Sequence, residues 1–203
     1  MSDDTPVFDH YSFHAASTDE LAASPASELM KFTGYFLDVR TKHFDWQRYR
    51  AAIADRPHEM LRSQKFESAD IFRQNNVVSF IVNSIGDILH RVSGSDAGFD
   101  RDVMTARVEN AFTSLEIKEE SGFASWEMTG TNSAFTYRIM FDVPSNDATA
   151  DICSLVTTVR IIADIYEKET WFGLESTSRH EFSADVTAIR LACSKDFIAG
   201  PKP

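Results

Sequence analysis

Apolar and polar residues alternate over sixteen positions between Cys153 and Lys168. The odd-numbered positions are mostly apolar, namely Cys153, Leu155, Val159, Ile161, Ala163 and Ile165. A period of two predicts a β-strand. Strands in globular proteins are usually about 5 to 6 residues long, whereas sixteen residues would extend roughly 53 Å at about 3.3 Å per residue. The length of this predicted strand requires a reason.

The same alternation recurs on both sides of this stretch. Residues 123–129, 134–144 and 179–193 are also predicted strands, and turn-forming sequences such as GTNS and SNDATAD separate them, so the chain forms a meander. One interpretation is a half-buried sheet that is covered by helices. The other is that the strands cross a membrane, because one pass needs about 9 to 11 alternating residues. Periodicity favours the first interpretation and does not decide between them.

The first half of the chain has helical periodicity instead. We expect a lone strand at 7–15 and helices at about 24–36, 44–54, 69–92 and 100–112. The helix at 69–92 has an apolar stripe at three- and four-residue steps, formed by Ile71, Val78, Ile81, Val82, Ile85, Ile88, Leu89 and Val92. The loop SGSDAG, which contains Gly94 and Gly98, joins this helix to the next one and is a candidate hinge.

Separate helical and strand-rich parts predict helices packed on an antiparallel sheet rather than alternating βαβ units. With 203 residues, of which 43% are hydrophobic, the chain can bury one sizeable core. We therefore expect a single domain over 1–203, with a helical half at about 18–112, a strand-rich half at about 113–197 and short mobile tails.

The chain is acidic, with a formal net charge of −11. This charge argues against a nucleic-acid partner and against ionic attraction to anionic lipids. The sequence contains no run of eighteen apolar residues and no recognisable signal peptide, so we expect a soluble form made in the cytoplasm. Cys153 and Cys193 lie in predicted strands, where a small buried thiol is the common state.

Several stretches carry a family resemblance. They are YRIMFDVP, SLVTT followed by ADIYEK, the tip WFGL, the last strand with its KDF tail, and LMKFTGYFLDVRTKHFDWQRYRAAI at 29–53. Together they resemble the Cyt-type cytolysins, which are cytolytic delta-endotoxins, and more closely the volvatoxin-type fungal pore-formers. The resemblance implies a three-layer α-β-α sandwich in which two helical layers enclose an antiparallel sheet of about six strands.

The resemblance also implies a function. It implies a monomer or dimer in solution that binds membrane phospholipids, zwitterionic ones on the charge argument, and that oligomerises and breaches target cells from outside without metal or cofactor. Two features depart from the family. The C-terminal tail has only Lys195 and Lys202 beside Asp196, which puts polyanion binding there in doubt, and Arg160 and Asp164 make the long strand more polar than a membrane strand.

We expect membrane insertion to begin when helices 69–92 and 100–112 swing off the sheet at the glycine loop. The freed face would then meet lipid through Phe135, Ile139, Phe141, Leu155, Val159, Ile161, Ile165, Phe182 and Val186. In a competing version the sheet stays intact and the apolar stripe of the helix, with Val78, Ile81, Val82, Ile85, Ile88 and Leu89, lies in the interface or assembles there. Trp171 and Phe172 at a hairpin tip would either anchor at the lipid interface or cover the end of the core.

Catalytic and metal-binding patterns are weak. His10 and His14 stand four apart without a third ligand, and His180 and Glu181 point to opposite faces of a strand. No nucleophile elbow or phosphate-binding loop occurs, so we expect no enzyme. The alternative function is a nonlytic lipid or hydrophobic-ligand binder of the same fold, with an acyl chain held between helices and sheet.

Overall fold

The computed structural model describes residues 7–13 and 25–203. The strands are β1 (Asp9–Ser12), β2 (Leu61–Val77), β3 (Ala124–Thr129), β4 (Asn132–Pro144), β5 (Ile152–Ala163) and β6 (Arg179–Cys193). The helices are α1 (Pro25–Gly34), α2 (Trp46–Ala54), α3 (Val78–Ser93), α4 (Arg101–Phe112), α5 (Leu115–Glu120) and α6 (Lys168–Phe172).

The strands form one six-stranded sheet in the order β1-β4-β5-β6-β2, with β3 also paired to β4. β1 and β3 share the outer edge of β4, where β1 runs parallel beside residues 139–142 and β3 runs antiparallel beside residues 132–137. The remaining pairs are antiparallel. The sheet is therefore antiparallel except for the short first strand.

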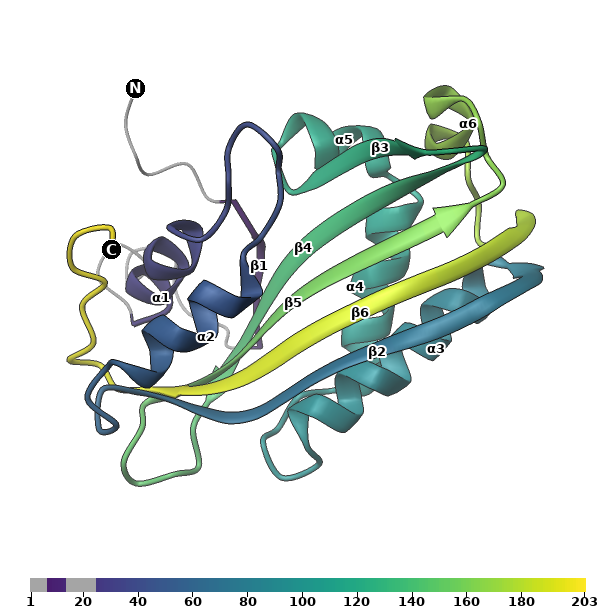
Figure 1. Cartoon of the computed structure of the whole chain (residues 1–203). Helices are drawn as coiled ribbons and strands as arrows, with labels where there is room; N and C mark the ends of the chain where they lie inside the picture. Colours follow the sequence, from purple (N-terminus) through teal and green to yellow (C-terminus); the bar gives the residue numbers. More distant parts are fainter. Residues whose placement is uncertain (1–6, 14–24) are drawn as a thin grey trace.

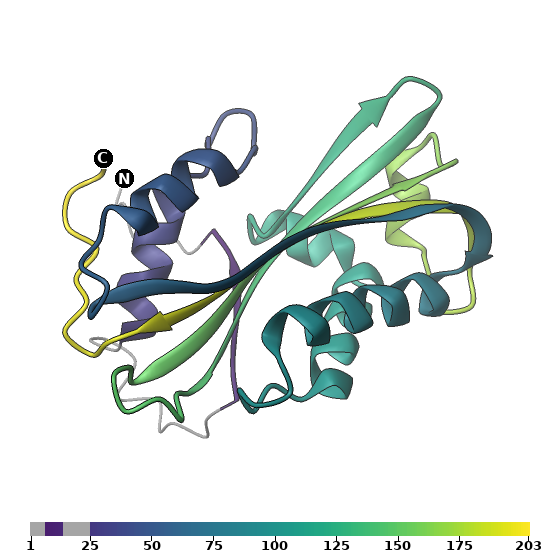
Figure 2. The same ribbon diagram turned by 60° about the horizontal axis from the view of Figure 1, so that its bottom comes forward.

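Helices cover both faces of the sheet. Figure 1 shows α1 and α2 in front of one end of the sheet and α3 and α4 behind it, and the turned view in Figure 2 separates the two layers. Each layer has its own apolar core, one under α3 and α4 and the other under α1 and α2. The predicted three-layer sandwich with an antiparallel six-stranded sheet is confirmed.

This arrangement explains the long strands. β4, β5 and β6 have 13, 12 and 15 residues, and each carries side chains into both cores on opposite faces. The predicted strand at 153–168 is shorter than expected, because the backbone leaves the sheet after Ala163 although Ile165 remains buried. The stretch TWFGLESTS is not a simple hairpin tip, since it begins within the short helix α6.

The structure corrects the predicted helix 69–92. Residues 69–77 form the second half of β2, a 17-residue strand at the edge of the sheet, and the helix begins only at Val78. Ile71 precedes Val78 by seven positions, which equals two helical turns by coincidence. Two irregularities in the pairing of β2 with β6, between Ser63 and Lys65 and between Ile71 and Gln74, interrupt the alternation that would have indicated a strand.

Candidate functional site: the sheet face under α3 and α4

The nine side chains that were expected to meet lipid lie together on one face of the sheet. Their exposed fractions are between 0 and 3%, and all belong to the core under α3 and α4. They are Phe135, Ile139 and Phe141 on β4, Leu155, Val159 and Ile161 on β5, Ile165 after it, and Phe182 and Val186 on β6. The structure thus brings together every residue of this predicted set, in a buried position.

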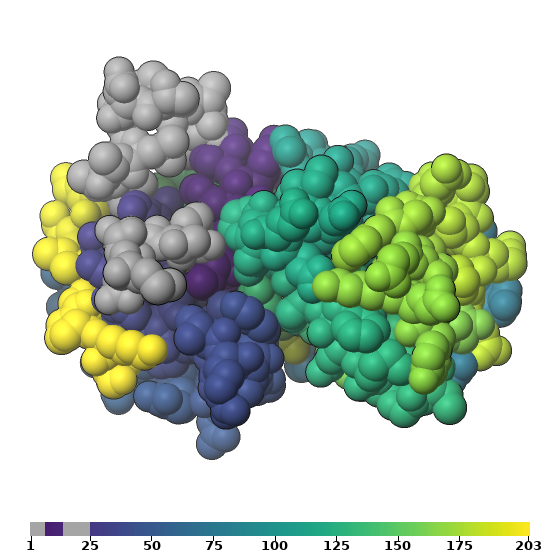
Figure 3. Space-filling model, turned by 90° about the horizontal axis from the view of Figure 1, so that it is seen from above, coloured from purple at the N-terminus to yellow at the C-terminus, as the bar shows by residue number. Residues whose placement is uncertain are grey.

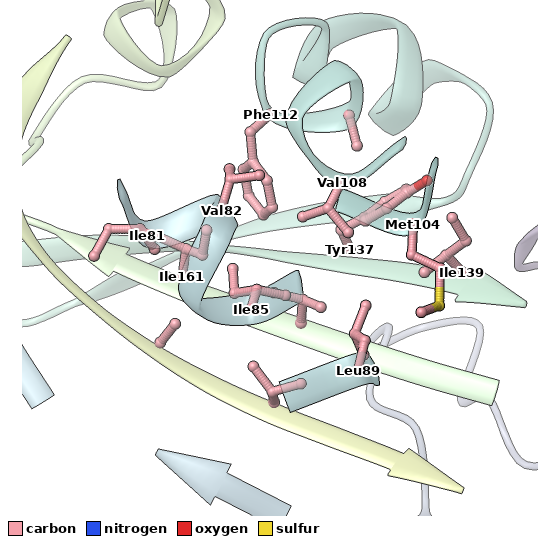
Figure 4. Packing of buried hydrophobic residues seen from close by; sticks show 14 of the residues in the cluster. Ile81, Val82, Ile85, Leu89, Met104, Val108, Phe112, Tyr137, Ile139 and Ile161 are labelled. Carbon is pink, nitrogen blue, oxygen red and sulfur yellow. The ribbon is translucent and has the colours of Figure 1, made fainter. Parts of the chain in front are cut away.

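The α3 helix covers this face with its predicted apolar stripe. Val78, Ile81, Val82, Ile85, Ile88 and Leu89 are between 0 and 7% exposed. In Figure 4, Ile81, Ile85 and Leu89 of α3 and Val108 of α4 lie close to Tyr137, Ile139 and Ile161 of the sheet. The contact between helix and sheet is predominantly apolar, and the buried Thr157 of β5 is a polar residue on the same sheet face.

A close approach holds α3 and α4 together. A Cβ atom added to Gly86 of α3 would lie 2.0 Å from Thr105 Oγ1 of α4, so no larger residue fits without a shift. Thr105 Oγ1 is itself fixed, because it donates a hydrogen bond to the Arg101 carbonyl oxygen at 2.8 Å. The two helices therefore pack as one unit against the sheet.

Little free space remains between this unit and the sheet. A cavity of about 10 Å³ lies among Val78, Ile81, Phe112, Trp171 and neighbouring apolar side chains. This volume is about that of a single water site. An acyl chain could enter here only if the helices moved.

The predicted hinge lies at the far tip of the helix pair. Gly94 and Gly98 have φ values of 75° and 82°, which favour glycine. α3 follows β2 directly at Val77 and Val78, so this junction and the end of α4 connect the pair to the sheet. The glycine loop therefore lies at the end of the helix pair away from these connections.

Arg190 of β6 clamps this loop, and the sequence analysis missed it. Its Nη1 donates to the Ser93 carbonyl oxygen at the end of α3 at 2.6 Å and to Asp96 Oδ1 at 3.2 Å. A signal was available, because Arg190 continues the inward-facing series of β6 that ends in Val186 and Ala188. A cation on an otherwise apolar strand face needs a partner, and here the partner is the end of a helix.

A second tie lies on the rim beside β2. Arg91 near the end of α3 forms an ion pair with Glu67 of β2, and Lys65 Nζ donates to the Arg91 carbonyl oxygen at 2.5 Å. The hydrogen bond from Arg91 lowers the pKa of Glu67. Exposed ion pairs contribute about 0 to 1 kcal/mol each, so the apolar interface remains the main contribution to docking of the helices.

Trp171 and Phe172 occupy α6 at one end of this core. Trp171 is fully buried, its Nε1 donates to Ser133 Oγ at 2.8 Å, and its ring lies 5.3 Å from that of Phe135. Phe172 is half-buried. In this structure Trp171 covers the end of the core, so a role as an interfacial anchor would require α6 to move.

The histidine at the start of the chain serves a structural ion pair. His10 Nε2 lies 2.5 Å from Asp142 Oδ2, and Ser154 Oγ donates to the other carboxylate oxygen. Burial lowers the pKa of His10, but the hydrogen bond and charge of Asp142 more than offset this, so the pKa lies above its ordinary value of 6.5. His14 lies outside the described residues. Within 7–13 and 25–203 there is no group of three or more His, Cys, Asp or Glu residues that could hold a metal ion.

Both cysteines are free and buried. Burial raises the pKa of Cys153 to about 11 and that of Cys193 to about 12, so both are protonated thiols at neutral pH. No helix in the described part of the chain is long and apolar enough to cross a membrane.

Comparison with known proteins decides the family. The model of the family described as Bacillus thuringiensis toxin matches residues 38–194, which is most of the chain. The chain belongs to this family of Cyt-type cytolysins. Its members are cytolytic toxins, and the family is not a known enzyme family.

Two cytolytic delta-endotoxins are similar to this Cyt-type chain. It is 22% identical over 174 residues to the type-2Bb protein of Bacillus thuringiensis subsp. jegathesan. The aligned region covers 81% of this chain and 65% of that protein. It is 24% identical over 124 residues to the type-2Ba protein of Bacillus thuringiensis subsp. israelensis. The aligned region covers 59% of this chain and 47% of that protein. The matched regions thus span about half to two thirds of these relatives.

The fold agrees with a solved structure of the family. The activated Cyt2Ba monomer from Bacillus thuringiensis subsp. israelensis superposes with a TM-score of 0.78 at 16% identity, covering 94% of this chain and 100% of that one. These matches are to delta-endotoxins, and a closer likeness to the volvatoxin-type proteins stays a prediction.

Proposed function

We propose that this Cyt-type chain permeabilises lipid bilayers of target cells from outside and forms pores after its α3–α4 pair leaves the sheet. One observation carries the proposal. A pair of helices covers an apolar sheet face mainly through apolar contacts, and only a few polar ties, such as those from Arg190 to the glycine loop at its tip, add to them. A cover of this kind can be exchanged for acyl chains without breaking the hydrogen bonds of the sheet.

When acyl chains replace the helices, the burial that the apolar sheet residues lose is balanced by the burial that they gain in the bilayer. Each large apolar side chain is worth about 1.5 to 3 kcal/mol when it is fully removed from water. The nine sheet residues lose this burial when the helices leave and regain it in hydrocarbon. The free energy of the exposed intermediate is the barrier, and a nearby bilayer lowers it.

The strands are long enough to cross a membrane, and the two faces of the sheet differ in polarity. β4, β5 and β6 have 13, 12 and 15 residues, more than the about 9 to 11 that one pass requires. On the face away from α3 and α4, Thr136, Thr158, Arg160 and Thr187 are polar and half-buried. Arg160 and Asp164, which made the long strand too polar in the sequence analysis, therefore need not meet lipid: Arg160 is on the opposite face and Asp164 lies beyond the strand.

Oligomerisation follows from the sheet edges. β2 is an edge strand of 17 residues, and unpaired backbone groups cannot remain in hydrocarbon. Neighbouring copies would pair these edges in the membrane. We propose a monomer or dimer in solution and a homo-oligomer on membranes of zwitterionic phospholipids.

Two alternatives make different demands. If α3 lay in the interface, its polar side would meet headgroups through Ser79, Asn83, Asp87 and Arg91, which carry no net positive charge. A nonlytic binder would need room for a ligand, and the cavity under the helices is about 10 Å³. Helix release followed by strand insertion accounts for the strand lengths as well, so it is the preferred mechanism.

Dye release from phosphatidylcholine vesicles tests the function. Protein is titrated over several decades of concentration beside a heat-denatured control. Steep, concentration-dependent release is expected from an oligomerising cytolysin. Intact vesicles at every lipid composition and pH, with correctly folded protein, would refute permeabilisation and favour the nonlytic binder.

A further inference from the structure

A polar groove of about 380 Å³ lies on the face of the sheet opposite the α3–α4 pair. One wall is the loop of residues 38–43, and the other is formed by β3 and the adjoining part of β4. In Figure 3 this loop, in dark blue, and the teal atoms of β3 and its neighbours lie on either side of a recess. The function proposed above does not use this groove.

The groove is positively charged, although the chain has a net charge of −11. Its lining includes Arg40, Lys42, Arg138 and Arg160 against the carboxylates of Glu127 and Asp185. Both carboxylates are engaged by Arg160, through Nε to Glu127 Oε1 at 2.8 Å and through Nη1 to Asp185 Oδ2 at 3.3 Å. The other three cations have no carboxylate partner in the groove.

Arg138 is the most unusual of these cations. It is fully buried, and among the residues that the structure describes its guanidinium donates to main-chain carbonyl oxygens alone, those of Val7 at 3.2 Å, Lys42 at 3.4 Å and Gly122 at 2.6 Å. Buried charges are normally paired with an opposite charge. Burial lowers the pKa of Arg138 to about 10, so it still carries its charge at neutral pH. It gives the floor of the groove a fixed positive potential.

The loop presents its two cations in a fixed geometry. Asp38 Oδ1 accepts from the main-chain N–H groups of Arg40 at 2.8 Å and Thr41 at 2.9 Å. Lys42 has a φ of 59°, an uncommon conformation that places its carbonyl oxygen near Arg138. Arg40 and Lys42 themselves are exposed, so their side chains are free to contact a ligand.

Hydroxyl groups line the sheet side of the groove in two neighbouring cross-strand rows. Thr158 and Thr187 lie beside each other in the row of Arg138, and Ser125 and Thr136 lie beside each other in the row of Arg160. Hydroxyl donors together with Arg and Lys side chains are the groups that bind phosphate oxygens. Neutral ligands would leave the excess positive charge uncompensated.

We propose that this groove binds the phosphate group of a phosphate ester. This proposal rests on the proposed membrane function in one respect, which is that the phosphate ester would be a phospholipid headgroup. A free phosphate ester has the same chemistry and is the other source. Contact through this groove would orient the sheet at a membrane surface although the protein as a whole is acidic, because the groove is locally positive.

Isothermal titration calorimetry at low ionic strength tests the site with two probes, glycerophosphocholine and inorganic phosphate. The variant Arg40→Gln/Lys42→Asn removes both exposed cations, and Asn tolerates the left-handed conformation of residue 42. The matched control Lys31→Gln/Arg48→Gln removes two exposed cations from α1 and α2 outside the groove. Each lost charge-assisted hydrogen bond is expected to weaken binding roughly tenfold, and the control should bind as the wild type does.

A second measurement does not depend on the variants. Titration of either probe into wild-type protein should shift the NMR amide signals of Thr158 and Thr187. Tighter binding of glycerophosphocholine than of inorganic phosphate supports a lipid headgroup, and the reverse order supports a free ester. No saturable binding of either probe, equal loss in the control, or amide shifts confined to other parts of the chain would overturn the site.

The two proposals fail separately. Dye release without probe binding would remove the phosphate site and leave permeabilisation intact. Probe binding without dye release would leave the site intact and remove permeabilisation.

Discussion

The packing of α3 on the sheet can be weakened without changing the sheet residues that are proposed to meet lipid. Leu89 of α3 is fully buried in the core under α3 and α4, and Leu29 of α1 is fully buried in the core on the opposite face. Leu→Ala at either position removes the same atoms from an equally buried site, at a cost of about 2 to 5 kcal/mol in the free energy of unfolding. The two variants are a matched pair that differs in which helical layer is loosened.

The two variants should differ in their membrane activity. In Leu89→Ala the lost packing favours release of α3, and 2 kcal/mol corresponds to an increase of about 30-fold in the released population, at about tenfold per 1.4 kcal/mol. The initial rate of dye release from phosphatidylcholine vesicles at limiting protein should rise by up to this factor. Leu29→Ala should lose comparable stability in urea without this acceleration.

An equal change in the rate of dye release in the two variants would refute this prediction. Equal acceleration would mean that general loss of stability, and not displacement of α3, limits permeabilisation. A slower rate in Leu89→Ala than in Leu29→Ala would mean that α3 has to stay docked.

Three further changes test other contacts. Gly86→Ala should lower the free energy of unfolding by about 1 to 3 kcal/mol through overpacking against Thr105, and Gly86→Ala/Thr105→Ala should recover part of the loss in thermal unfolding. The ion pair with Asp142 raises the pKa of His10 above 6.5, so the stabilisation by this pair is complete below pH 6.5 and is lost as the pH rises through the higher pKa of the folded state. The difference in unfolding free energy between wild type and His10→Gln, measured in urea, should therefore shrink over that rise in pH. A difference that stays constant with pH would contradict the ion pair. Arg190→Met should speed hydrogen exchange in the last turn of α3, and unchanged exchange would show that the clamp on the glycine loop is unimportant.

Periodicity predicted the apolar face because each strand repeats its pattern without interruption. Phe135, Ile139, Val159 and Val186 were assigned to one face from alternation alone, and the structure buries all of them on that face. The stripe of α3 was predicted for the same reason. A regular element with one buried face leaves a periodic trace in the sequence.

Where the pattern is broken or shared, the sequence was not sufficient. β2 is an edge strand with two pairing irregularities, which interrupt its alternation. Residues 69–77 were therefore predicted as the start of a helix, because Ile71 fits the helical stripe. Arg138 occupies one of the alternating polar positions of β4, which predicts an exposed side chain. The three-dimensional structure shows instead that it is buried, with no carboxylate partner among the described residues. Trp171 was predicted near a chain reversal, and its burial depends on Ser133 and Phe135 from another strand.

In the proposed mechanism α3 has to leave the sheet before the membrane is breached. Glu67→Cys/Arg91→Cys places two thiols where the native side chains form an ion pair between β2 and α3, far from the junction at Val77 that connects the two elements. A short reducible thiol-reactive linker can join them, while burial keeps the native thiols of Cys153 and Cys193 protonated and unreactive. Dye release from phosphatidylcholine vesicles is measured before and after reduction, with each single-cysteine variant treated alike.

Linked protein is expected to leave the vesicles intact, and reduction should restore dye release, while the single-cysteine controls release dye in both states. Equal release by linked and reduced protein would contradict helix displacement.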